Sequence, residues 1–215
     1  APPTAEQVLS DAKAKAAKEN KAIFVHFSAS WCGWCKRLDA FLERACMRTL
    51  AGWLAGVPEW EAKNLIGLHI WESASAVDAL YGRLRELRAH QPERGISDGL
   101  RALAAELDHA QTSAEVIASV YLVVKTALLE TYRAHLDLTW EDFDNPTVKI
   151  ISERIVGLAE SQVAWAIQFF PEVSARYPGW EAWRDYIAGL LVADGGVTGT
   201  QLHLAAPARP EGHAL

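Results

Sequence analysis

The sequence predicts a mainly α-helical protein, in which an antiparallel bundle of long helices follows a short helix–strand–helix segment. Apolar residues recur at alternating steps of four and three along three stretches after residue 58, and proline or capping residues bound these stretches. Helices with such stripes must bury them on one another, which predicts the bundle. The N-terminal segment differs from the bundle because it contains the one predicted β-strand, Ala22–Ser28. This strand leads into the motif Cys32-Gly33-Trp34-Cys35.

The first 44 residues are expected to form a helix, a strand and a second helix. Thr4 and Gln7 have the spacing of a capping box, so a helix should run over residues 5–19. The strand over residues 22–28 is short, aromatic and β-branched. Helical spacing resumes at residues 36–44, directly after the cysteine motif.

Three long helices are expected after this segment. The first covers residues 58–89, the second begins after Thr112, and the third begins at Asn145-Pro146, with Asn145 as the cap and Pro146 in the first turn. Their seams run through Ile66, Ile70, Ser73, Val77, Leu80, Leu84 and Leu87; through Ile117, Tyr121, Val124, Leu128, Thr131, His135 and Leu138; and through Val148, Ile151, Ile155, Leu158, Gln162, Trp165 and Phe169.

Shorter elements complete the predicted organisation. Helices are expected over residues 100–109 and 180–192, and the Gly- and Pro-containing stretch that follows should be irregular. We therefore divide the chain into a segment 1–44 with the cysteine motif, a helical bundle 45–193 and an irregular tail 194–215.

Composition narrows the function classes. A net charge of −6 argues against a nucleic-acid-binding protein, and no apolar run approaches the roughly 20 residues that span a bilayer. Three cysteines are too few for a disulfide scaffold or a four-cysteine zinc site. The start at Ala1 fits a processed, exported N-terminus or a chain boundary equally well, so a periplasmic and a cytoplasmic location are equally expected.

The cysteine motif indicates redox chemistry. A cysteine at the first turn of a helix lies beside unpaired backbone N–H groups and the positive end of the helix dipole, which stabilise its thiolate. A second cysteine three residues later lies one turn away and can resolve a mixed disulfide. Cys32 is the candidate nucleophile and Cys35 the resolving thiol.

The segment Ala22–Glu43, with its strand, small-residue turn and Trp31-Cys32-Gly33-Trp34-Cys35-Lys36, resembles the first strand and active-site helix of the thioredoxin superfamily. The resemblance implies exchange with a thiol or disulfide protein substrate and needs no cofactor. A complete member would continue with further strands and a cis-proline loop, whereas this chain shows no second strand pattern. The alternative is an inactive fragment. An unpaired strand could also pair with a second copy, giving a homodimer.

Residues 48–193 resemble ferritin-like helical proteins of bacteria, through Trp60-Glu61-Ala62-Lys63, Tyr132-Arg133-Ala134-His135-Leu136 and Ala159-Glu160-Ser161-Gln162. In active relatives the resemblance implies a carboxylate-bridged di-iron or di-manganese centre, which needs Glu-x-x-His on two helices. Here Ser75 and Val163 stand where those histidines would be. The remaining weak metal candidates are Glu61, His69, Glu72, Glu130, Glu153 and Glu160.

Polar residues on the seams predict a polar pocket inside the bundle. These residues are Ser73, Thr131, His135 and Gln162. Buried polar groups need partners, so we expect them to bond across the bundle. Two functions follow from the sequence. One is thiol–disulfide exchange through Cys32 and Cys35. The alternative is a non-catalytic helical binding or scaffold module with a vestigial metal site.

Overall fold

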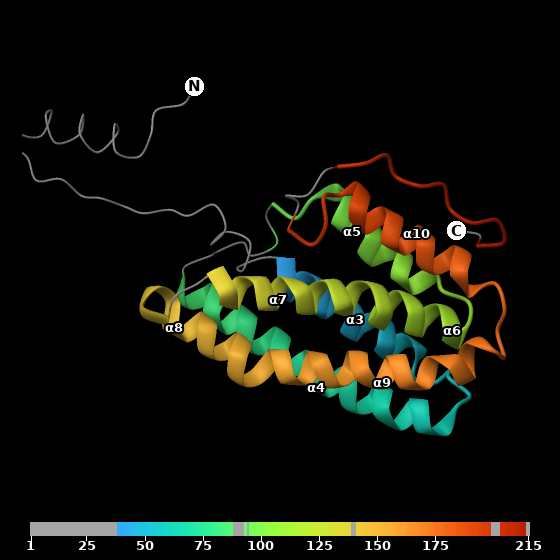
Figure 1. Cartoon of the computed structure of the whole chain (residues 1–215), viewed down its shortest axis with the longest axis horizontal. Helices are drawn as coiled ribbons and strands as arrows, with labels where there is room; N and C mark the ends of the chain where they lie inside the picture. The colour runs from blue at the N-terminus through green and yellow to red at the C-terminus, as the bar shows by residue number, and fades with distance from the viewer. Residues whose placement is uncertain (1–37, 88–92, 94, 139–140, 199–202, 214–215) are drawn as a thin grey trace, which may run out of the picture. The chain divides into compact units, whose positions relative to one another are not determined.

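The computed structural model describes residues 38–87, 93, 95–138, 141–198 and 203–213, and every regular element in these ranges is a helix (Figure 1). The mainly α-helical prediction is therefore confirmed for this part of the chain. The predicted helix 5–19, the strand 22–28 with the homodimer expected through it, and the motif Cys32–Cys35 all lie outside the described residues.

The first helical hairpin consists of α3, Leu38–Trp53, and α4, Trp60–Glu86. Most side chains of α3 are buried, including the polar Glu43 and Thr49, and one face of the helix, with Arg44, Arg48, Ala51 and Gly52, is exposed. Helix α3 continues without interruption past residue 44, where the sequence predicted a division of the chain. That division stays a prediction. The predicted helix 58–89 is confirmed as α4, with ends two or three residues shorter.

The second long helix begins at Ser113, where the Thr112 side chain accepts a hydrogen bond from the Glu115 amide, as the capping pattern predicts. It consists of α6, Ser113–Val116, the π-helix η2, Ile117–Lys125, and α7, Thr126–Leu138. A π-helix holds more residues per turn than an α-helix, so it rotates the apolar face of the turns that follow. Among the turns that follow, Tyr132 is fully buried and the predicted seam residue Thr131 is half-buried, while the predicted seam residues Leu128 and His135 are buried as expected.

The third long helix is α8, Glu141–Ile150, the π-helix η3, Ile151–Ile155, and α9, Val156–Ser174. The prediction that it starts at Asn145-Pro146 is wrong, because Pro146 lies inside α8. A proline removes one backbone donor, here the bond to the residue 142 carbonyl, but its fixed φ suits a helix. Pro146 is the sixth residue of α8, so the helix continues through one missing hydrogen bond.

Two contacts set the helix directions in the bundle. His69 and Ser73 of α4 contact Tyr121 and Lys125 of η2 in the same order, so α4 and η2 run parallel. Two consecutive parallel helices need a connection that runs back along the bundle. The segment between α4 and α6 provides it and contains α5, Asp98–Glu106, and the short 3-10 helix η1, Leu107–His109. The opposite order of the pairs His69–Trp165 and Glu72–Gln162 makes α4 and α9 antiparallel.

The last helix, α10, Trp180–Ala193, lies beside α5, and the C-terminal residues pass over α10 (Figure 1). The described residues after α10 contain no helix; residues 195–197 are buried, whereas most of residues 203–213 are exposed and only single side chains of that stretch pack on the bundle. A Cβ added to Gly189 would lie 2.7 Å from Cγ of the Pro207 ring, which is too close for two carbon atoms. The absence of a side chain at Gly189 therefore permits the close approach of Pro207. Arg209 binds Glu106 through two nitrogens, and the His213 ring stacks on Trp183 with centroids 4.4 Å apart.

Within the described ranges, no helix is both long and apolar enough to cross a membrane.

Candidate functional site

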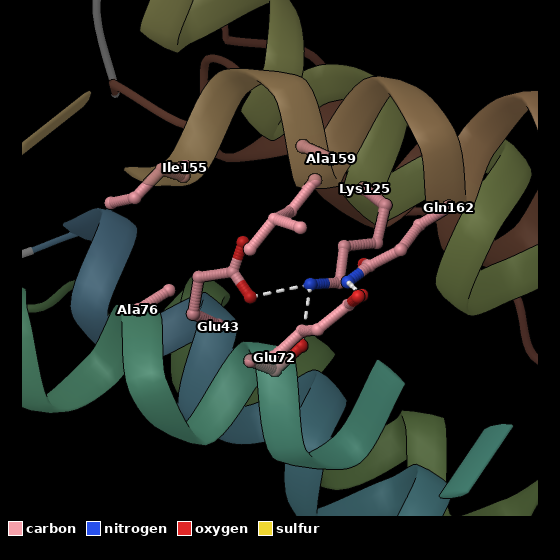
Figure 2. A pocket seen from close by; sticks show the side chains of 9 residues that line it. Glu43, Glu72, Ala76, Lys125, Ile155, Ala159 and Gln162 are labelled. Atoms are coloured by element: carbon pink, nitrogen blue, oxygen red, sulfur yellow. Dashed lines mark hydrogen bonds and ion pairs between the residues drawn. The ribbon is translucent and has the colours of Figure 1, made fainter. Parts of the chain in front are cut away.

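A charged cluster lies inside the bundle, where α3, α4, α7 and the end of η2 meet (Figure 2). The Lys125 ammonium donates to Glu43 Oε2 at 2.5 Å and to Ser73 Oγ at 2.8 Å. The Tyr132 hydroxyl donates to Glu43 Oε1 at 3.3 Å. Both carboxylate oxygens of Glu43 therefore have a partner, and one of them is a full positive charge.

This ion pair is almost completely removed from solvent, since the side chains of Lys125 and Glu43 are each 2 % exposed. Removing two charges from water costs several kcal/mol per ion, and only close pairing with further hydrogen bonds offsets that cost. Ser73 and Tyr132 supply those further bonds. The cluster is therefore electrostatically complete without any added ion at Glu43.

A second polar pair lies next to it, where α4 faces α9. Gln162 Nε2 donates to Glu72 Oε2 at 2.8 Å, and Gln162 Oε1 is buried without a hydrogen-bond partner among the described residues. Both residues line a small cavity together with Glu43, Ser73 and Lys125. The space between these side chains is about 10 Å³, which is room for a single water molecule. Such a water would satisfy Gln162 Oε1.

An aromatic layer adjoins the charged cluster. His69 Nδ1 lies 2.9 Å from the Tyr121 hydroxyl, and the edge of Trp165 contacts both rings. Burial, assisted by the nearby Lys125 charge, lowers the pKa of His69 to about 4. Burial also raises the pKa of Tyr121 well above its ordinary value. His69 is thus a neutral hydrogen-bond partner of a neutral tyrosine at physiological pH.

Cys46, the cysteine that the structure describes, is fully buried in α3 and makes no disulfide. Burial raises its pKa to about 12, and Glu43 adds to the shift while Lys125 opposes it. Because the thiolate is the reactive form, Cys46 is an inert core residue.

The six metal candidates from the sequence do not come together. Glu61, Glu130, Glu153 and Glu160 are exposed, and Glu160 pairs with Arg133 at 2.6 Å. His69 is bound to Tyr121 and Glu72 to Gln162. No group of three His, Cys, Asp or Glu side chains in the described residues could hold a metal ion. With an ammonium already bound to Glu43, these residues do not fit a carboxylate-bridged metal pair.

The predicted polar pocket is formed by only two of the four seam residues. Ser73 and Gln162 line it, whereas the half-buried Thr131 and the buried His135 do not. Sequence reasoning missed Glu43 and Lys125. A signal for Lys125 existed, since it stands four residues after Tyr121 at the edge of an apolar stripe, where a lysine must be paired.

The predicted redox cysteines, Cys32 and Cys35, lie outside the described residues. Cys35 precedes the first residue of α3, Leu38, by three positions in the sequence. Beyond this point α3 is fixed by contacts on several sides. Besides the Glu43–Lys125 pair, the Thr49 hydroxyl donates to Asp108 at 2.5 Å and Arg48 Nη2 donates to the Ala104 carbonyl at 3.1 Å.

Comparison with known proteins identifies one similarity. A family model described as thioredoxin-like matches residues 4–46, about a fifth of the chain. The match includes Cys32 and Cys35 and ends at Cys46, within α3. The predicted thioredoxin-like N-terminus is confirmed by this match, while the ferritin-like character of the bundle stays a prediction. No curated protein and no solved structure matches the chain.

Proposed function

We propose that the protein carries out thiol–disulfide exchange through Cys32 and Cys35, with disulfides of other proteins as substrates. The observation that carries the proposal is the thioredoxin-like match over residues 4–46, which contains both cysteines at the spacing that dithiol chemistry needs. The match ends inside α3, and α3 packs against α4 of the bundle.

The proposed reaction is an exchange of two electrons. The Cys32 thiolate attacks one sulfur of a substrate disulfide, a Cys32–substrate disulfide forms, and the other substrate sulfur leaves as a thiolate that takes up a proton. The Cys35 thiolate then attacks the Cys32 sulfur, and the second substrate sulfur leaves in the same way. The enzyme ends as the Cys32–Cys35 disulfide, and an external dithiol must reduce it before the next cycle.

We infer that the helical bundle supports the active-site helix in place of the sheet of a complete thioredoxin fold. Support comes from α3, which is buried on most sides and held by the Glu43–Lys125 pair and the Thr49–Asp108 bond. A nucleophile at a helix start needs a rigid helix to keep its position.

Steady-state reduction of a peptide disulfide by dithiothreitol, with and without the protein, tests the proposal. We expect the wild-type chain to accelerate the reaction and Cys32→Ser to abolish the acceleration. Cys35→Ser, incubated with the peptide disulfide before any dithiothreitol is added, should accumulate a mixed disulfide at Cys32. Cys46→Ala is the matched control, since Cys46 is buried and protonated, and it should retain the activity. Equal rates for wild-type and Cys32→Ser would reject the proposal.

We further propose that residues 45–193 form a ferritin-like bundle with a vestigial metal site, which would make the bundle a scaffold. Support comes from the parallel direction of α4 and η2, since a single long crossover of this kind occurs in ferritin-like bundles. The ammonium of Lys125 pairs with Glu43, so it neutralises a carboxylate in the core beside the cavity that Glu72 also lines. Iron or manganese retained stoichiometrically by the purified protein would contradict this scaffold role.

A further inference from the structure

The chain after α10 ends in a short bent segment, Pro207-Ala208-Arg209-Pro210-Glu211-Gly212-His213, which we call the tail motif. The His213 amide donates to the Pro210 carbonyl at 3.5 Å, and Gly212 has a φ of 94°. This φ lies in the left-handed region, which glycine adopts without strain. The two prolines have a fixed φ as well, so the bend costs little conformational entropy.

Two side chains of the tail motif contact acidic residues of the bundle. Arg209 donates to Glu106 Oε2 of α5 through Nε at 2.9 Å and Nη2 at 2.6 Å. His213 stacks on Trp183 of α10, with its Nε2 3.2 Å from Glu115 Oε1 of α6. The Glu106 and Glu115 side chains are 17 % and 8 % exposed, and within the described ranges the ion-pair partner of each is in the tail motif. The bundle therefore offers two negative charges that a ligand must complement.

Two further contacts position the chain on the bundle. Pro207 lies against Gly189 of α10, where a side chain would clash with the ring, and Gln111 Nε2 donates to the Gly212 carbonyl at 2.8 Å. This surface thus recognises a proline ring, a guanidinium, a backbone carbonyl and a flat aromatic ring. We call it the tail groove, and its residues are Glu106, Gln111, Glu115, Trp183 and Gly189.

We propose that the tail groove is a binding site for proline- and arginine-containing segments of other polypeptides, and that the tail motif occupies it until such a segment displaces it. A peptide of this chemistry is already seated on the surface, so the shape and the charge of the groove suit such a partner. Two carboxylates without a cation from the bundle itself favour a basic segment over an acidic one.

The tail motif leaves part of the possible binding energy unused. Trp183 Nε1 and His213 Nδ1 are buried and have no hydrogen-bond partner among the described residues. A buried polar group without a partner costs about 1–3 kcal/mol. A segment that places an acceptor beside the indole N–H should therefore bind more tightly than the tail motif. In addition, Ala208 and Glu211 between the contacts are exposed, so the motif is held by single side chains.

The attachment of the tail motif to its own site affects any competition. A tethered ligand acts at an effective concentration on the order of millimolar, so a free segment of equal intrinsic affinity displaces it only at a similar concentration. A natural partner must bind more tightly. For a test, weakening the tail motif by substitution should open the groove to a free peptide of the wild-type sequence.

Fluorescence anisotropy of a labelled synthetic peptide of residues 205–213, titrated with the full chain, tests the proposal. We expect the tail variant Arg209→Gln/His213→Gln to bind the peptide with at least a roughly tenfold lower dissociation constant than the wild type. Adding Glu106→Gln to the tail variant should raise the dissociation constant at least roughly tenfold. Adding Asp185→Asn instead is the matched control and should change nothing, because this exposed carboxylate of α10 lies two residues after Trp183, on a different side of the helix.

Pro207→Gly weakens the tail motif without removing a charge and provides a second tail variant with the same expected direction. Circular dichroism checks that each variant keeps its helices. Equal affinities of the wild type and both tail variants, or the absence of binding up to about millimolar concentration, would overturn the proposal. Binding that Glu106→Gln leaves unchanged would also overturn it, because the peptide would then use another surface. The peptide contains no cysteine, so these outcomes are independent of thiol–disulfide exchange at Cys32.

Discussion

The Lys125 ammonium and the Glu43 carboxylate form an ion pair of 2.5 Å in the interior of the helical bundle, with each side chain 2 % exposed. The pair joins the last residue of the π-helix η2 to α3, the helix that follows the cysteine motif. Ser73 and Tyr132 add hydrogen bonds from two further helices, so four segments depend on one charged cluster.

We predict that breaking this pair on one side strongly destabilises the protein. In Lys125→Met the Glu43 carboxylate stays buried without its counter-charge, and the free energy of unfolding should fall by about 3–5 kcal/mol. Urea denaturation of wild type and variant measures the change. The double variant Lys125→Met/Glu43→Leu removes both charges and should recover most of the loss, because an apolar pair of similar volume replaces the ion pair. A double variant whose loss of unfolding free energy equals the sum of the losses in the two single variants would contradict this account.

Stability should depend on pH through His69. Its folded pKa of about 4 lies below the ordinary value of about 6.5, so the unfolded chain binds the proton more readily. The contribution of His69 is therefore complete above pH 6.5 and is lost as the pH falls toward 4, by up to about 3 kcal/mol. The difference in unfolding free energy between wild type and His69→Gln, measured across this window, isolates the effect. A difference that is constant with pH would show that His69 titrates normally in the folded protein.

Gly189 should be intolerant of any side chain, because the tail passes directly over it. A Cβ at this position would lie 2.7 Å from the Pro207 ring, which is not a flexible side-chain end. We expect Gly189→Ala to lower the free energy of unfolding by about 1–3 kcal/mol. Gly82→Ala in α4 is the matched control, since its Cβ would meet no atom within 4 Å, and it should raise stability by about 0.5–1 kcal/mol. Thermal unfolding of both variants compares them, and equal stabilisation would mean that the tail does not pack on α10.

The Cys46 thiol should be unreactive in the native protein. With a pKa of about 12 and no exposed surface, its thiol should not react with iodoacetamide at neutral pH until the bundle unfolds. Peptide mapping by mass spectrometry, with and without urea, measures its modification. Rapid labelling of Cys46 in the folded protein would contradict its placement in the core of α3.

Periodicity predicted the long helices well, because each apolar stripe reflects burial along one face. Thr112 and Glu115 located the start of the second helix correctly, since a capping box reports a local hydrogen bond. Pro146 misled the prediction of the third, because the residues before it complete a helical turn despite the missing donor.

The interior of the bundle was harder to predict. No local pattern in the sequence indicates the π-helix η2, and the seam that follows it was predicted only in part, since Leu128 and His135 are buried but Tyr132 rather than Thr131 is in the core. Glu43 stands 82 residues before its partner Lys125, and only tertiary packing brings the two charges together. The cysteine motif is the opposite case, since residues 31–35 are contiguous and the thioredoxin-like resemblance of the segment around them could be seen from the sequence alone.

The pH dependence of Cys32 alkylation tests the central claim most directly. In Cys35→Ser/Cys46→Ala, Cys32 is the remaining thiol, so the rate of iodoacetamide labelling reports its thiolate fraction. If Cys32 is the nucleophile of a thiol–disulfide exchange enzyme, the profile should give a pKa below about 7 that rises on unfolding in urea. A pKa near the free-cysteine value of about 8.5 in both the folded and the unfolded chain would contradict the proposed function.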